Sequence, residues 1–191
     1  PISAKLPRHE RDQIIELGKP SLIIGVQPGE YEGTPSVPLG FEPDAAVSDD
    51  ALPERTAASL KAMTSGGSTG RPKLIVSAQP AAWDTELPFL EIQQQGAMLV
   101  PGPLYHNGPF VWAMTALFRG CTVAITTRFD AEKTLETIER VQIDIVYMVP
   151  TMMRRIWSLP EDVRTKYDIS CLKTLWHLAA PCPAWLKECF I

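Results

Sequence analysis

The chain has 191 residues, of which 45% are hydrophobic and 21% are charged, values that are ordinary for a folded domain and argue against intrinsic disorder. The length lies within the single-domain range, and a formal net charge of −4 gives no basic surface for nucleic acid. Because no apolar run reaches the roughly 18 residues that span a bilayer, we expect no transmembrane segment.

The N-terminal part of the chain predicts few regular elements. Residues 7–17 predict a short helix, because Pro7 suits a helix start and Gly18 suits its end. Residues 21–26 form an apolar run that predicts a strand. Residues 27–53 carry many of the 18 prolines together with several acids, so we expect an irregular connection there, with the weakest order of the chain.

The rest of the chain alternates between strand and helix patterns, which is typical of β-α-β units. The expected strands are residues 74–77, 97–100, 122–126, 143–149 and 174–178. The expected helices are residues 79–95, 110–118, 131–141 and 151–157, and one from Ala184 onward. Asp130 is placed to cap the helix over 131–141, whose apolar residues recur near one face. We therefore expect an α/β fold with a largely parallel sheet flanked by helices.

The most informative segment is the run Thr64-Ser65-Gly66-Gly67-Ser68-Thr69-Gly70-Arg71-Pro72-Lys73. Glycines let a backbone approach phosphate oxygens, hydroxyls donate hydrogen bonds or bind a metal, and a lysine adds positive charge. Arg71-Pro72 after the last glycine excludes a Walker loop, and no register fits the Gly-x-Gly-x-x-Gly dinucleotide fingerprint. A flexible linker is the alternative, but linkers are rarely so compact or lysine-terminated. The segment therefore predicts a polyphosphate-binding loop.

This run resembles the signature loop of the AMP-forming, adenylate-forming enzymes, which include acyl-CoA synthetases, luciferases and peptide-synthetase adenylation domains. The usual loop is Ser/Thr-Ser/Gly-Gly-Ser/Thr-Thr-Gly-x-Pro-Lys, which residues 65–73 match. Residues Pro103-Leu104-Tyr105-His106-Asn107-Gly108 resemble the next motif, whose histidine or aromatic residue lies beside the acyl and adenylate pocket. Residues His177-Leu178-Ala179-Ala180-Pro181 resemble a segment, usually Gly-Gly-Ala-Pro, that lies along the adenine. Leu178 and Ala179 stand where the usual motif has glycines.

The resemblance implies a two-step reaction. An ionised carboxylate needs no general base to attack the α-phosphorus of ATP, but its approach to an anionic triphosphate requires a positive field. Lys73, the backbone N–H groups of residues 66–70 and Mg²⁺ would supply that field. The thiol of coenzyme A would then capture the acyl-adenylate. ATP, Mg²⁺ and coenzyme A are the cofactors and co-substrates that the family implies.

The resemblance also assigns roles to individual residues. The candidate catalytic residues are Lys73 and His106. The candidate nucleotide-binding residues are Ser65, Gly66, Gly67, Ser68, Thr69, Gly70, Lys73, Ala179, Ala180 and Pro181. The candidate Mg²⁺ ligands are Ser65, Ser68 and Thr69. His106 would orient the carboxylate or line the acyl pocket, although a lone loop histidine is more often a structural hydrogen-bonding group.

Taken together, the motifs lead us to expect that residues 1–191 are part of the large N-terminal AMP-binding domain of a longer enzyme. The family's later glutamate segment and the catalytic lysine of its small domain have no counterpart here, so the piece alone should not complete the reaction. The leading interpretation is an acid–CoA ligase for a hydrophobic acid, fatty or steroid-like. The alternatives are an aryl-acid adenylating enzyme that feeds a carrier protein, and a degenerate nucleotide-binding module without turnover.

Other residue types give weaker signals. The four cysteines form no Cys-x-x-Cys pair and the three histidines lie far apart, so zinc is not expected. Free thiols in a reducing cytoplasm are favoured, although an even cysteine count leaves a disulfide open. The apolar residues between 110 and 117 have the spacing of a helix core face more than of an acyl tunnel. The sequence leaves a homo-oligomer open.

Overall fold

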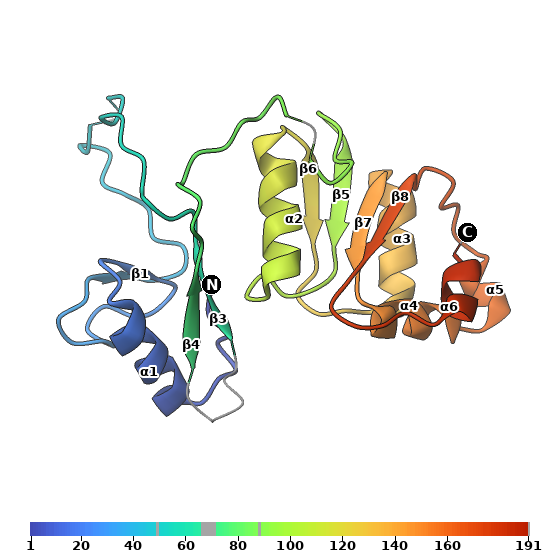
Figure 1. The fold of residues 1–191 in the computed structure, drawn as a ribbon, viewed down its shortest axis with the longest axis horizontal. Helices are drawn as coiled ribbons and strands as arrows, with labels where there is room; N and C mark the ends of the chain where they lie inside the picture. The colour runs from blue at the N-terminus through green and yellow to red at the C-terminus, as the bar shows by residue number, and fades with distance from the viewer. Residues whose placement is uncertain (49, 66–71, 88, 191) are drawn as a thin grey trace. The chain divides into compact units, whose positions relative to one another are not determined.

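The computed structural model describes residues 1–48, 50–65, 72–87 and 89–190. The chain forms two compact units, one of Ile2–Ala82 and one of Trp83–Ile191 together with Pro1. We call them the N-terminal and the C-terminal unit. Their helices and strands are labelled in Figure 1, except for β2.

The N-terminal unit is built from a helix and pairs of short strands. The elements are α1 (Arg8–Gly18), β1 (Ile23–Ile24), β2 (Ser36–Val37), β3 (Ala62–Ser65) and β4 (Lys73–Val76). β1 pairs with β2 in parallel, and β3 pairs with β4 antiparallel. The helix expected over 7–17 and the strand expected over 74–77 are confirmed, whereas the strand expected over 21–26 is only Ile23–Ile24.

An arginine ties the helix of this unit to the irregular chain that follows it. Arg8 donates from Nε to Asp12 at 2.7 Å and from Nη2 to the carbonyl oxygen of Glu30 at 2.8 Å. Its guanidinium also lies 4.3 Å from the ring centre of Tyr31. Between residues 27 and 53 the described residues form turns, bends and β2. The contacts of Arg8 with Glu30 and Tyr31 hold the start of this connection against α1.

The C-terminal unit is a parallel sheet with helices on both faces. Its strands are β5 (Ala97–Val100), β6 (Thr122–Ile125), β7 (Ile145–Met148) and β8 (Thr174–His177). Its helices are α2 (Asn107–Phe118), α3 (Ala131–Val141), α4 (Pro150–Trp157), α5 (Glu161–Arg164) and α6 (Ala184–Glu188). The strands lie in the order β6-β5-β7-β8, and every neighbouring pair is parallel. The α/β fold with a parallel sheet is therefore confirmed.

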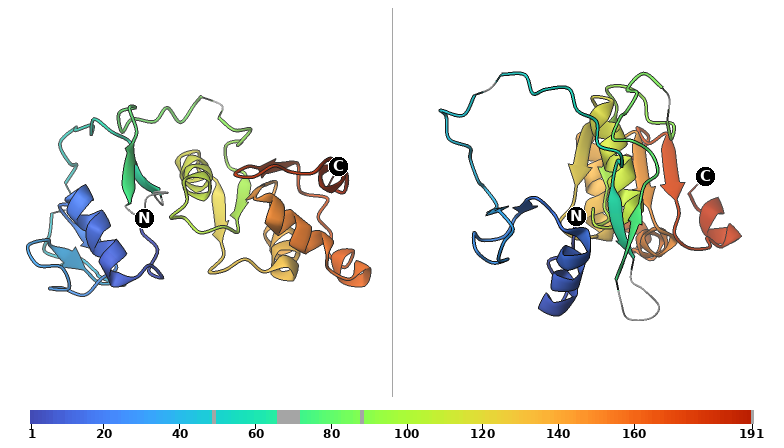
Figure 2. Two further views of the ribbon diagram at one scale, coloured as in Figure 1. Left: turned by 60° about the horizontal axis from the view of Figure 1, so that its bottom comes forward. Right: turned by 60° about the vertical axis from the view of Figure 1, so that its left-hand side comes forward.

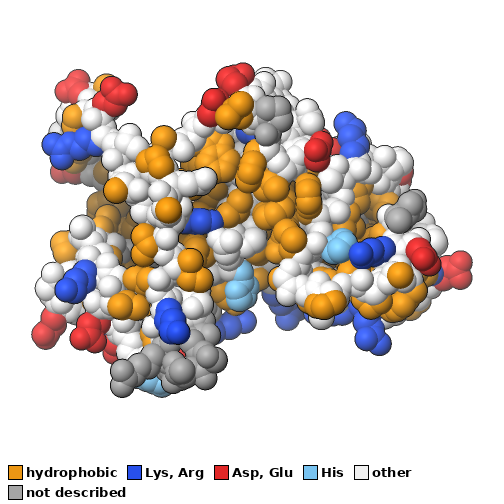
Figure 3. Space-filling model, viewed as in Figure 1, with side chains coloured by type: hydrophobic (Ala, Val, Ile, Leu, Met, Phe, Trp, Pro, Cys, Tyr) orange, Lys and Arg blue, Asp and Glu red, His pale blue; other side chains and the backbone are white. Residues whose placement is uncertain are grey.

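Two apolar cores explain why these strands are so regular. On one face of the sheet, Leu99 and Val146 pack with α3 and α4, whereas on the other face Met98 and Tyr147 pack with α2. Figure 2 shows the sheet between these helices. Strands covered on both faces are continuous apolar runs, which is why β5 and β7 could be predicted. Apolar side chains also remain exposed on both units (Figure 3), among them Ile75 and Leu117.

The helix expected over residues 79–95 is wrong, because tertiary hydrogen bonds hold this segment in another conformation. The guanidinium of Arg119, of which only 8% is exposed, donates to the carbonyl oxygens of Ile92 at 2.7 Å, Thr85 at 2.7 Å and Leu87 at 2.8 Å. A helix would use these carbonyl groups internally. Local propensity is a weak prior, and here the buried arginine overrides it.

Backbone conformation within this segment agrees with that explanation. Leu90 and Glu91 both have a φ of 55°, and Gln95 has a φ of 59°. Left-handed residues cannot continue a right-handed helix, and outside glycine each costs about 1–2 kcal/mol. The indole N–H of Trp176 donates to the carbonyl oxygen of Leu90 at 3.0 Å and so helps to hold this conformation. The sequence patterns also did not predict α5, a single short helical segment without buried residues.

The amino edge of the sheet provides a test of this packing. Gly96 lies against Asp144, whose Oδ1 accepts a hydrogen bond from the N–H of Ala97 at 3.1 Å. A Cβ at residue 96 would lie only 2.7 Å from Oδ2 of Asp144. We expect Gly96→Ala to displace this carboxylate and to lower the free energy of unfolding by about 1–3 kcal/mol, measured by urea unfolding.

The matched comparison is the same substitution in an Asp144→Ala background. In that background the carboxylate that a new Cβ would contact is absent, so Gly96→Ala should lower the free energy of unfolding much less. If Gly96→Ala lowers the free energy of unfolding equally in both backgrounds, the carboxylate of Asp144 is not the reason that glycine is required at this position.

Candidate functional site

The β3–β4 hairpin brings together the two ends of the predicted phosphate loop. Its register places Ser65 directly opposite Lys73. Residues opposite each other in an antiparallel pair have Cβ atoms about 4.5–5.5 Å apart. A hydroxyl and an ammonium group therefore flank the base of the loop. The predicted residues Gly66, Gly67, Ser68, Thr69 and Gly70 lie outside the described residues.

Lys73 is available to a ligand at this position. Lys73 is the first residue of β4, and its side chain is exposed. Ser65, which lies opposite it on β3, is half-buried. Within the described part of the chain, Lys73 forms no ion pair. Its charge is therefore not neutralised by a neighbouring carboxylate, which suits an anionic ligand. The roles of Ser65 and Lys73 stay predictions.

The second group of predicted residues lies at the carboxyl edge of the parallel sheet. The chain leaves β5 through α2 toward β6, whereas it leaves β7 through α4 and α5 toward β8. These opposite directions make a topological switch point between β5 and β7. Ligands of open α/β sheets bind outside the carboxyl ends of the strands at such a point. His106 follows β5, and Ala179 to Pro181 follow β8, so the topology places them at this edge.

His106 stands directly before the first turn of α2. It has an extended backbone, with φ −92° and ψ 144°, and its side chain makes no cap hydrogen bond. The carbonyl oxygen of His106 accepts from the N–H of Phe110 at 3.1 Å. Its imidazole lies 4.7 Å from the ring of Tyr105, centre to centre. The ring is exposed at the sheet edge, where it could meet a ligand.

Ala179, which stands where the motif has a glycine, has a backbone conformation that favours glycine. Its φ is 71°, in the left-handed region that favours glycine. Leu178, Ala180 and Pro181 beside it are exposed, and none of them has a positive φ. The segment after β8 therefore bends as a glycine would allow, with added strain at one alanine.

Three aromatic side chains lie behind the first turns of α2. Trp112 is 4.8 Å from Tyr147 and 5.8 Å from Trp176 between ring centres. Trp112 is only 7% exposed and Tyr147 only 3%. The helical spacing of residues 110–117 thus indicated a core face correctly for Trp112, whereas Leu117 is exposed. No sequence signal set Tyr147 apart, because it lies within a wholly apolar strand.

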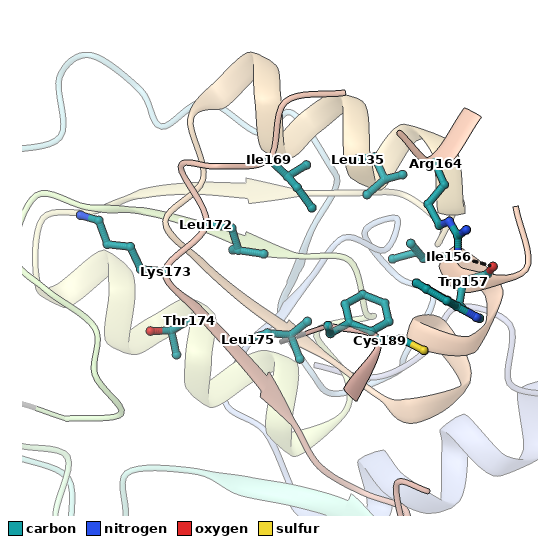
Figure 4. Close-up of a pocket in the computed structure, with 11 residues that line it drawn as sticks. Leu135, Ile156, Trp157, Arg164, Ile169, Leu172, Lys173, Thr174, Leu175 and Cys189 are labelled. Carbon is teal, nitrogen blue, oxygen red and sulfur yellow. Dashed lines mark hydrogen bonds between the residues drawn. The ribbon is translucent and has the colours of Figure 1, made fainter. Parts of the chain in front are cut away.

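A separate cavity of about 330 Å³ opens beside the amino half of β8. Figure 4 shows its apolar side chains, with the guanidinium of Arg164 lying 3.7 Å from the ring centre of Trp157 at one end. The lining residues are Leu135, Ile156, Trp157, Arg164, Ile169, Leu172, Lys173, Thr174, Leu175, Cys189 and Phe190. No predicted site residue lines this cavity. It is distinct from the hairpin and from the carboxyl edge.

The described residues hold no ready-made metal centre. In those ranges, no group of three or more His, Cys, Asp or Glu side chains could hold an ion. The four cysteines are all free. Mg²⁺ keeps several waters and binds mainly through substrate phosphates, so the hydroxyl of Ser65 fits it as one ligand of an ion carried by a nucleotide.

None of the described helices is both long and apolar enough to cross a membrane.

Known proteins share this organisation. Residues 1–190 match the family model of the AMP-binding enzymes. A feruloyl-CoA synthase from Amycolatopsis sp is 31% identical over 133 residues, which is 68% of this chain and 27% of the relative. A medium/long-chain-fatty-acid–CoA ligase from Mycobacterium tuberculosis is 27% identical over 143 residues, which is 73% of this chain and 24% of the relative.

A solved structure supports the fold over almost the whole chain. The O-succinylbenzoate coenzyme A synthetase from Bacillus subtilis, in complex with AMP, has a TM-score of 0.64 at 19% identity. The match covers 98% of this chain and 49% of that chain. The present chain spans about a quarter of the length of the two relatives named above.

The strained alanine yields a test of the segment after β8. Because Ala179 has a φ of 71°, Ala179→Gly should relieve left-handed strain. Glycine also loses more chain entropy on folding, about 0.5–1 kcal/mol, so the net effect should be unchanged or slightly higher stability. Ala180→Gly is the matched control and should be destabilising, since Ala180 is not left-handed. Urea unfolding that ranks the two variants in the opposite order would contradict this account.

Proposed function

The chain belongs to the AMP-binding enzyme family, and on that premise we propose that it is part of an ATP-dependent acid–CoA ligase. The enzyme activates a hydrophobic carboxylic acid as an acyl-adenylate and transfers the acyl group to coenzyme A. The observation that carries the proposal is the β3–β4 hairpin, whose register sets Ser65 opposite Lys73 at the base of the glycine- and hydroxyl-rich loop.

In this proposal the hairpin supplies charge stabilisation. A carboxylate is ionised near neutral pH and is nucleophilic without a base. Its barrier lies in approaching an anionic triphosphate while pyrophosphate departs, and preorganised positive groups lower that barrier. The exposed ammonium of Lys73 stabilises charge on the departing phosphates. The hydroxyl of Ser65 would contribute one ligand to Mg²⁺, which would supply further positive charge to the triphosphate.

The carboxyl edge of the sheet orients the acid and the adenine. The exposed imidazole of His106, at the switch point between β5 and β7, donates to the carboxylate or to the adenylate formed from it. Ala179, Ala180 and Pro181 border the adenine, where the left-handed backbone of Ala179 turns the chain as a glycine would.

The acid is hydrophobic, in our proposal fatty or steroid-like. Support comes from the medium/long-chain-fatty-acid–CoA ligase among the relatives. The feruloyl-CoA synthase favours a second candidate, an aryl acid. Both relatives carry coenzyme A in their names, which supports that thiol over a carrier protein as the acceptor.

The complete enzyme is proposed to be longer than this chain. The relatives are about four times as long as the part that it matches, so the remaining catalytic groups would come from further polypeptide. By this reasoning the 191 residues alone should not turn over substrate.

Four free cysteines support a reducing compartment such as the cytoplasm.

The role of Lys73 can be tested with an uncharged residue of similar shape. In the complete enzyme, Lys73→Met should lower the rate of acid-dependent pyrophosphate release by about 100- to 1000-fold, the usual cost of one preorganised donor. The measurement is single-turnover pyrophosphate release with fatty, steroid and aryl acids, alongside thermal unfolding. The acid class that gives the largest wild-type rate distinguishes the two substrate candidates.

The control is Lys61→Met, at the opposite end of the same hairpin, directly before β3. This variant should keep the wild-type rate within a few-fold. A Lys73→Met enzyme that is folded and equally fast would refute the role of Lys73. Binding of ATP without pyrophosphate release, for every acid, would instead favour a nucleotide-binding module without turnover.

A further inference from the structure

The first turn of α2 is weak by itself. Gly108 is its second residue, and glycine in a helix costs about 1 kcal/mol relative to alanine. Pro109 follows in the first turn, where proline is tolerated but donates no hydrogen bond. His106, at the N-cap, makes no side-chain cap hydrogen bond to this turn. The position of this turn must therefore depend on packing against the sheet.

Tyr147 of β7 supplies that packing. A Cβ at residue 108 would lie 2.6 Å from Cζ of Tyr147 and closer still to its hydroxyl oxygen, so only glycine lets the backbone approach the phenol. One helical turn later, Trp112 packs on the same ring at 4.8 Å between centres. Residues four apart lie on one face of a helix. A single side chain thus contacts two successive turns of α2.

The phenol is a rigid and neutral support. Only 3% of Tyr147 is exposed, and its strand is covered on both faces. Burial also raises the pKa of the Tyr147 hydroxyl, which keeps the group uncharged near neutral pH. The ring is held by Trp112 and the strand by its parallel neighbours, so Tyr147 has little freedom to follow a movement of the helix.

Movement of the turn would carry His106 with it. The carbonyl oxygen of His106 accepts from the N–H of Phe110 at 3.1 Å, which couples this residue to the first turn. Gly108 is only two residues further along the chain. A shift of the backbone at Gly108 therefore changes where the exposed imidazole stands at the sheet edge.

We propose that Tyr147 is a positioning residue for His106, acting through the close contact of its phenol with Gly108. It sets the distance of the first turn of α2 from β7, and with it the place of the imidazole at the switch point. This inference rests on the proposed function, since the part that His106 plays in adenylation belongs to that proposal. Tyr147 itself acts on the helix and not on the substrate.

The first test reads the position of His106 without any reaction. The complete protein is labelled with ¹⁵N-histidine, and the imidazole signals are compared by NMR in Gly108→Ala, which pushes the turn outward, and Tyr147→Phe, which removes the atom nearest to residue 108 while keeping the ring. Both should move the signals of His106 and leave those of His9 and His177 in place. Tyr147→Phe guards against a failure of Gly108→Ala to fold.

The matched control is Tyr167→Phe. This tyrosine donates to Glu132 at 2.9 Å, in contact with α3 and not with α2. Its loss should leave all His106 signals unchanged. Unmoved His106 signals in folded Gly108→Ala and Tyr147→Phe proteins would overturn the proposal.

The second test separates positioning from general stability. Misplacement of a reacting group by about 1 Å can cost as much as 100-fold in rate, so Gly108→Ala should slow adenylation by about tenfold or more. In a His106→Ala background the same substitution should cost much less, because the group that it displaces is gone. Equal losses in the two backgrounds would mean a purely structural effect and would overturn the proposal.

A compensating variant sharpens the comparison. Tyr147→Leu removes the ring that a Cβ at residue 108 would contact, so adding it to Gly108→Ala should restore part of the lost adenylation rate.

Failure of the proposed function would give a different result. In that case no carboxylic acid supports adenylation in the wild-type protein, while the NMR comparison still decides whether Tyr147 positions His106.

Discussion

The parallel pairing of β5 with β7 is the constraint on which the C-terminal unit depends. Leu99 opposite Val146 lies at the centre of the sheet, and neither side chain is exposed. Asp144 secures the amino end of this pair, because its N–H donates to Ala97 at 3.0 Å and its carbonyl oxygen accepts from Lys173 at 2.8 Å. Because β5, β7 and β8 are parallel and their amino ends lie at one edge of the sheet, the segments that follow these strands all begin at the opposite edge.

The two edges of the sheet therefore differ in character. The amino edge is closed by backbone hydrogen bonds and by a carboxylate pressed against Gly96. The carboxyl edge holds exposed groups, with the imidazole of His106 and the left-handed backbone of Ala179. Weak or strained backbone at this edge is consistent with a site whose geometry is imposed by the surrounding core. In the N-terminal unit, considered by itself, the hairpin presents the exposed ammonium group of Lys73.

Sequence patterns predicted the elements that are buried on regular faces. β5 and α3 appear with the expected bounds, since their apolar residues follow the periods of a covered strand and an amphipathic helix. The segment over 79–95 could not be predicted, because its conformation depends on Arg119, which lies beyond it in the chain and reaches its carbonyl groups only in the folded unit. Local patterns carry no information about such partners.

The candidate site divides in the same way. The loop motif identified Ser65 and Lys73, but their direct opposition is a property of the hairpin register. Tyr147 could not be singled out, since a tyrosine in an apolar strand indicates core and its contact with Gly108 joins positions far apart in sequence. At position 179 the motif has a glycine, and the alanine found here has a left-handed φ, which the sequence alone did not predict.

The central claim is that a carboxylate attacks the α-phosphorus of ATP, and oxygen transfer tests it most directly. The complete enzyme would be given an acid labelled with ¹⁸O in its carboxylate, together with ATP and coenzyme A, and the products analysed by mass spectrometry. Attack at the α-phosphorus followed by capture of the acyl group leaves one labelled oxygen in AMP. Label in inorganic phosphate together with ADP, or no transfer with any acid, would contradict the account.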